Sequence, residues 1–135
     1  MVIASEDGKR IICVGSSDIL FSVYSTIMVR LKYCHNSIRS AIIFLKTGKC
    51  FSDKCMETAR EFNLIRDALS QIKPEDAVYD FRDLQKEAPW KNNLSEVITS
   101  CANLYTSSDG RDLLFEIVSI LCYGGTVGQL IQIQG

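Results

Sequence analysis

Residues 2–31 read VIASEDGKRIICVGSSDILFSVYSTIMVRL, and a change of hydrophobic period inside this stretch decides the fold class. Two short β-branched runs, residues 2–4 and 11–14, flank an Asp-Gly turn signal, which predicts a β-hairpin. From Ile19 to Leu31 apolar residues recur at helical spacing behind the hydroxyls of Ser16 and Ser17, which predicts a helix over about residues 17–33. Strands and a helix therefore share one short segment.

The middle of the chain carries two further helical patterns. One begins at Asn36-Ser37 and is placed to end at Gly48, since glycine readily takes the left-handed conformation of a helix end. The next begins at Ser52 and keeps a helical rhythm until Pro74, which cannot continue a helix.

The remaining residues predict a mixture of short elements. Residues 77–79 predict a strand, and residues 81–94 predict an ordered loop. The pattern of residues 98–106 is ambiguous between strand and helix, with a strand favoured at 104–106. Residues 107–109 are expected to cap a helix whose apolar face runs from Leu113 to Leu121 and which Gly124-Gly125 ends. Residues 130–134 alternate as a closing strand.

This order of elements lacks the strict alternation of strand and helix that a parallel doubly wound sheet requires. It predicts one α+β domain over residues 1–135, with a mainly antiparallel or mixed sheet of four to five strands packed with three to four helices.

Composition and charge narrow the function classes. The net charge of −1 gives no basic face for nucleic acid or anionic lipid, although residues 1–50 carry seven basic against three acidic side chains and residues 51–135 eight against thirteen. No signal peptide or apolar run of membrane-spanning length is present, and the six cysteines form no CxxC pair. We expect a cytoplasmic protein whose cysteines, such as Cys13 and Cys55, are reduced and fill the core.

No catalytic or metal-binding motif stands out. A nucleophile elbow, a phosphate-binding glycine loop and a zinc-protease motif are absent. The single histidine, His35, stands beside Cys34, but neighbours on a helix end point in different directions, so we expect neither a Cys-His nucleophile nor a metal site. His35 is expected at an exposed helix end, and no cofactor is expected.

The segment 75–87 is the most suggestive part of the chain. It contains five carboxylates, Glu75, Asp76, Asp80, Asp83 and Glu87, and only two basic side chains, Arg82 and Lys86. They form a solvated loop, a protein-binding edge or, with Asp80 and Asp83 as a pair, an acid–base site. Trp90, the only tryptophan, follows Pro89 and is either a packing anchor or an interface residue, and Tyr79 is a second aromatic candidate.

A resemblance covers residues 80–115. Asp83-Leu84, Ala88-Pro89-Trp90, Asn93-Leu94-Ser95, Ile98-Thr99-Ser100, Asn103-Leu104-Tyr105 and residues 106–113 together resemble the polymorphic-toxin immunity protein family numbered seventy. The helix over residues 21–27 and the region from Ile65 to Pro74 are similar in order and placement.

The resemblance implies a small bacterial antidote that binds a cognate toxin domain and has no catalytic residues of its own. The toxin is expected to be a nuclease, such as the C-terminal toxin of a contact-dependent inhibition system. The expected contact residues are Glu75, Asp76, Tyr79, Asp80, Asp83, Glu87 and Trp90. An enzyme using Asp80 and Asp83 or the thiol of Cys34, and a homodimeric structural module, are the alternatives; the oligomeric state is left open.

Overall fold

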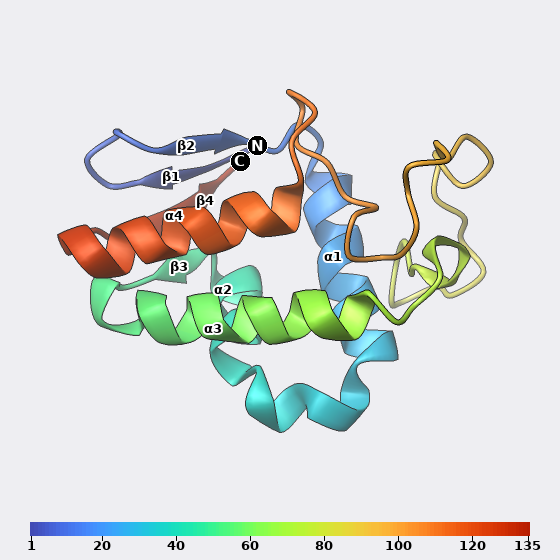
Figure 1. Ribbon diagram of the computed structural model, residues 1–135, viewed down its shortest axis with the longest axis horizontal. Coiled ribbons are helices and arrows are strands. Elements are labelled where there is room, and N and C mark those ends of the chain that lie inside the picture. The colour runs from blue at the N-terminus through green and yellow to red at the C-terminus, as the bar shows by residue number, and fades with distance from the viewer.

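The sheet is built from both ends of the chain and one short segment between its helices. The computed structural model describes residues 1–135, and in it β1 (Val2–Ser5) pairs with β2 (Ile11–Cys13) on one side and with β4 (Ile131–Gln134) on the other. The two-residue β3 (Lys49–Cys50) pairs with β4, so the strand order is β2-β1-β4-β3 with every pair antiparallel. The two termini consequently lie side by side (Figure 1).

Four α-helices surround one face of this sheet, which confirms the α+β expectation. They are α1 (Ser17–Arg30), α2 (Arg39–Thr47), α3 (Ser52–Leu69) and α4 (Leu113–Val127), with short 3₁₀ helices η1 (Lys32–Ser37) and η2 (Pro74–Asp76) between them. The hydroxyl of Ser16 accepts a hydrogen bond from the Asp18 amide and caps α1, and Gly48, with φ of 77°, ends α2. None of the helices combines the length and the apolar character needed to cross a membrane.

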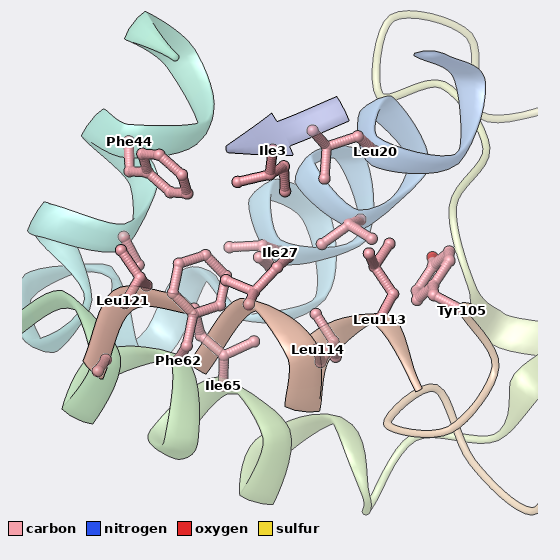
Figure 2. Close-up of a cluster of buried hydrophobic side chains, with 14 of the residues drawn as sticks. Ile3, Leu20, Ile27, Phe44, Phe62, Ile65, Tyr105, Leu113, Leu114 and Leu121 are labelled. Carbon is pink, nitrogen blue, oxygen red and sulfur yellow. The ribbon is translucent and has the colours of Figure 1, made fainter. Parts of the chain in front are cut away.

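The core lies where the helices meet the sheet. Figure 2 shows side chains from five elements converging on it: Ile3 of β1, Leu20 and Ile27 of α1, Phe44 of α2, Phe62 and Ile65 of α3, and Leu113, Leu114 and Leu121 of α4. Each such side chain stabilises the fold by about 1.5–3 kcal/mol through removal from water. Cys55 is fully buried as expected, but Cys13 is exposed, because strand alternation turns Ile12 inward and Cys13 outward.

The prediction that Gly124 and Gly125 end the last helix is wrong, since both lie inside α4. They are needed for close packing: a Cβ at Gly124 would stand 2.8 Å from the Gln129 carbonyl oxygen, and one at Gly125 would stand 2.6 Å from Met56 Cγ on α3. The helix instead ends at Gly128, whose φ is 77°. Local sequence cannot distinguish a glycine that breaks a helix from one that admits a neighbour.

The start of α4 also differs from expectation. Asp112, and not residues 107–109, is the cap: its carboxylate accepts a hydrogen bond of 3.2 Å from the Phe115 amide. Asp109 instead accepts a hydrogen bond from the Ser107 hydroxyl within the preceding turn. The turn is closed by a single bridge between Thr106 and Asp112, so the strand favoured at 104–106 is reduced to that one pair.

The strand expected at residues 77–79 does not form either, and β3 was not anticipated. The strand β3 has only two residues, which is too short to show a hydrophobic period. Residues 77–79 have the composition of a strand, but the backbone of Val78 hydrogen-bonds to side chains of α1 instead of to a neighbouring strand. Residues 81–94 are irregular, as predicted.

Candidate functional site

A long connection between α3 and α4 carries all seven expected contact residues. This connecting segment, residues 70–112, contains only the short η2, turns and one isolated bridge, and most of it lies beside α1 at one end of the molecule (Figure 1, yellow-green to orange). Irregular segments of this length are uncommon in compact proteins unless they serve a function.

Hydroxyl groups of α1 hold the beginning of the connecting segment. The Val78 amide donates to Thr26 Oγ1 at 2.9 Å, and Ser22 Oγ donates to the Val78 carbonyl at 2.8 Å. The hydroxyl of Tyr105, from the far end of the segment, lies 3.0 Å from Ser22 Oγ and 2.9 Å from Thr26 Oγ1. Burial raises the pKa of Tyr105 to about 12, although its two hydroxyl partners oppose this shift. One buried network therefore fixes both ends of the segment to α1.

Further bonds hold the segment between these points. The Phe81 amide donates to Ser25 Oγ at 3.0 Å, and Arg30 Nε at the end of α1 donates to the Asp76 carbonyl at 2.9 Å. The Cys101 amide donates to the Ile72 carbonyl at 2.9 Å. The segment is irregular in shape but closely held.

Asp80 is committed to an internal pair. Its carboxylate accepts two bonds from the Arg82 guanidinium, at 3.0 and 3.1 Å, and one from the Arg82 amide at 2.9 Å. These hydrogen bonds hold the pKa of Asp80 below its usual range, and only 6% of the residue is exposed. The same guanidinium lies over the Phe21 ring, 4.9 Å from its centre. Asp80 thus fixes the conformation of the segment, and its charge is neutralised locally.

The two aromatic candidates contact each other. Tyr79 and Trp90 meet edge to face with their ring centres 5.6 Å apart. The Tyr79 hydroxyl donates to Asp18 at 2.8 Å, which raises the Tyr79 pKa, and the Lys86 ammonium lies 5.7 Å from the centre of the Tyr79 ring. Both rings are partly exposed.

These rings form part of the wall of a cavity of about 420 Å³. Four of the seven expected residues line it, namely Glu75, Tyr79, Glu87 and Trp90. The others are elsewhere: Asp76 and Asp83 are exposed outside the lining, and Asp80 is buried in its ion pair. The volume is in the range of pockets that take a ligand or the tip of a partner's loop.

The lining is not simply acidic. Arg30, Lys86 and Lys91 also contribute to it, and the Lys91 ammonium lies 3.1 Å from the Glu87 carboxylate. Leu84, one of the lining residues, is 64% exposed. An exposed apolar side chain at a mixed polar hollow is typical of a surface that another macromolecule covers.

Cys34 and His35, which were considered as a nucleophilic pair or metal ligands, each contact a backbone carbonyl. The Cys34 thiol donates to the Leu31 carbonyl at 3.4 Å and its pKa is raised by burial, whereas a nucleophilic thiol needs a lowered pKa. His35 is partly buried, and its Nε2 lies 3.0 Å from the Ile27 carbonyl near the end of α1. No group of three or more His, Cys, Asp and Glu side chains is placed to hold a metal ion.

Sequence reasoning missed the polar face of α1. Ser22, Ser25 and Thr26 are fully buried, and they hold the connecting segment. The sequence did carry a signal for this role: the three residues recur at helical spacing beside the apolar stripe of α1. Small hydroxyl residues on one face of a helix can hydrogen-bond to the backbone of a neighbouring segment.

Residues 7–133 match the family described as Immunity protein 70. Neither a search of curated proteins nor a search of solved structures found a match. The family match confirms the resemblance seen in residues 80–115 and supports a toxin-neutralising role. It spans nearly the whole chain, and the protein therefore belongs to the immunity protein 70 family.

Proposed function

We propose that this protein neutralises a cognate toxin domain by binding it directly through the connecting segment, without any catalytic step. The observation that carries the proposal is the cavity beneath residues 75–94, where Tyr79 and Trp90 meet on a segment that α1 holds in place. Aromatic side chains in rigid surroundings are frequent centres of binding energy.

The fixed conformation of the segment favours tight association. A loop that must order itself on binding loses conformational entropy, and this loss subtracts from the affinity. Here the bonds from Thr26 and Ser22 to Val78, and the ion pair of Asp80 with Arg82, already fix the backbone in the free protein. A toxin would therefore meet a preformed surface.

The charges around the cavity bear on the kind of toxin. Asp83, Glu75 and Asp76 are exposed and make no ion pair within the chain, so they are available to a basic partner. A nuclease presents a basic substrate cleft, and carboxylates attract such a cleft over a distance. We therefore propose a nuclease toxin, such as the C-terminal domain of a contact-dependent inhibition protein, neutralised in the cytoplasm.

Co-expression with the toxin encoded beside this gene tests the function itself. Cells making both proteins should survive, and killing at full expression of this chain would refute the immunity role. The surface is tested by Trp90→Ala, which should weaken binding at least about tenfold in calorimetric titration with the purified toxin. Tyr33→Ala, at a 77% exposed aromatic on η1, is the matched control and should leave the affinity unchanged. If Tyr33→Ala weakened toxin binding more than Trp90→Ala does, the interface would lie elsewhere.

The nuclease proposal has a test of its own. Asp83→Lys should slow association at low salt, and this difference should vanish as the Debye length falls from about 30 Å at 0.01 M to about 3 Å at 1 M. Lys46→Glu, on α2, is the control and should leave association unchanged or slightly faster. Asp80 is unsuitable as a probe because its substitution would also break the ion pair with Arg82. An association rate independent of salt would refute electrostatic steering while leaving direct binding intact.

A further inference from the structure

Two buried thiols meet where α3 begins. Phe51 is the N-cap of α3, so Cys50 immediately precedes the cap and Cys55 is the fourth residue of the helix. Side chains at these two positions commonly pack together and fix the direction in which the chain joins a helix. In this protein both are cysteines, only 5% and 0% exposed, and Cys55 Sγ lies 3.6 Å from the Cys50 carbonyl oxygen.

The contact makes the two thiols chemically unequal. The hydrogen bond from the Cys55 thiol is the main cause that lowers the pKa of Cys50 to about 7, and Thr58 Oγ1, 3.4 Å from Cys50 Sγ, lowers it further. Burial and the carboxylates of Asp53 and Glu57 act in the opposite direction. The pKa of Cys55 is raised, first by the same contact and then by burial. The contact therefore favours the thiolate at Cys50 and the thiol at Cys55.

No other cysteine combines these features. Burial raises the pKa of Cys101 to about 12, and it also raises that of Cys34. Cys13 is exposed on the outer face of β2, and Cys122 on α4 is partly buried. A low-pKa thiol next to a second thiol is the arrangement of cysteines that oxidise selectively to a disulfide.

We propose that Cys50 and Cys55 are a modification site at which hydrogen peroxide forms an intramolecular disulfide. The Cys50 thiolate attacks one peroxide oxygen, the O–O bond breaks, and hydroxide leaves and takes up a proton to become water. The resulting sulfenic acid is then attacked by the Cys55 sulfur, which loses its proton as the S–S bond forms and a second water leaves. Two thiols are oxidised and one peroxide is reduced. The disulfide would make the contact at the start of α3 covalent.

The sequence around the pair makes the product easy to identify. Lys49, Lys54 and Arg60 are trypsin sites, so digestion places the two cysteines in separate peptides, residues 50–54 and 55–60. The folded protein is treated with peroxide until Cys13 is fully oxidised, free thiols are alkylated, and the digest is analysed by mass spectrometry. The expected product is peptide 50–54 linked to peptide 55–60, lighter by two hydrogen atoms than the unlinked pair and separated by dithiothreitol.

Variants check the order of the steps. Cys55→Ser should abolish the linked product and leave Cys50 as a sulfenic acid that dimedone labels, whereas Cys101→Ser should form the linked product as the wild type does. The peptide analysis of the wild-type protein tests the proposal even if a variant fails to fold. Unlinked peptides in protein whose Cys13 is fully oxidised would overturn the proposal, and so would linkage of Cys50 to another cysteine. Linkage found only after unfolding in urea would overturn it equally.

Discussion

Removal of the Thr26 hydroxyl tests whether α1 holds the connecting segment. Thr26→Val keeps the shape of the side chain but removes the acceptor that the buried Val78 amide uses at 2.9 Å. It also removes one of the two partners of the Tyr105 hydroxyl, while Ser22 remains bonded to both Val78 and Tyr105. The change therefore isolates one buried donor without opening a cavity.

The magnitude follows from the groups left without partners. A buried amide that loses its acceptor costs about 1–3 kcal/mol, and the lost bond to a tyrosine that keeps a second partner costs about 0.5–1.5 kcal/mol. We expect the free energy of unfolding to fall by about 2–3 kcal/mol. Proteins of this size are stable by about 5–15 kcal/mol, so the variant should remain folded.

Urea unfolding followed by two probes measures this effect. Far-UV circular dichroism reports on the helices, and the fluorescence of Trp90, the only tryptophan, reports on the connecting segment. In Thr26→Val the fluorescence transition should come at lower urea than the helical transition if the segment detaches first. Thr47→Val is the control, because the Thr47 hydroxyl is exposed and its loss should change stability by no more than about 0.5 kcal/mol. A Thr26→Val variant as stable as this control would refute the anchoring role.

Three further comparisons of variants test the packing, the cap and the acid stability. Gly124→Ala should destabilise the protein by about 1–3 kcal/mol in urea unfolding because its methyl group meets fixed backbone, whereas Gly125→Ala meets a flexible methionine and should cost less; equal losses would contradict this account. Asp112→Ala should cost about 1 kcal/mol as the cap of α4, and Asp109→Ala should cost clearly less; the opposite order, in the same assay, would restore Asp109 as the cap. The hydroxyl of Ser5, and then that of Tyr123, lower the pKa of Asp7 to about 2. The Asp7 carboxylate therefore stabilises the fold fully above its unfolded pKa of about 3.9, and this contribution is lost as the pH falls toward 2. Asp7→Asn should therefore lose less stability than the wild type between pH of about 4 and 2, and parallel melting curves of the two proteins over that range would refute the assignment.

Local sequence predicted the elements whose pattern is contained within a few residues. The hairpin at Gly8, the cap at Ser16 and the end of α2 at Gly48 all depend on backbone geometry that neighbouring residues impose. The α+β class and the family resemblance followed from the same kind of local signal. The prediction that the acidic segment 75–87 and its neighbour Trp90 form the contact surface also came from composition, and it stays a prediction.

Tertiary structure decided which groups satisfy the backbone and where glycine serves packing. Residues 77–79 have the composition of a strand, yet Thr26 and Ser22, distant in sequence, take up the hydrogen bonds of Val78. Gly124 resembles a helix breaker until β4 and α3 are placed against it.

The same division applies to the candidate site. The sequence identified Tyr79, Trp90 and the carboxylates as candidates, because residue type and local composition are visible in one dimension. Only the fold joined the two aromatic rings, held Val78 against α1, and brought Arg30 of α1 to the same cavity. A sequence specifies the groups that each residue offers, but which groups meet depends on contacts between distant segments, and those exist only once the chain has folded.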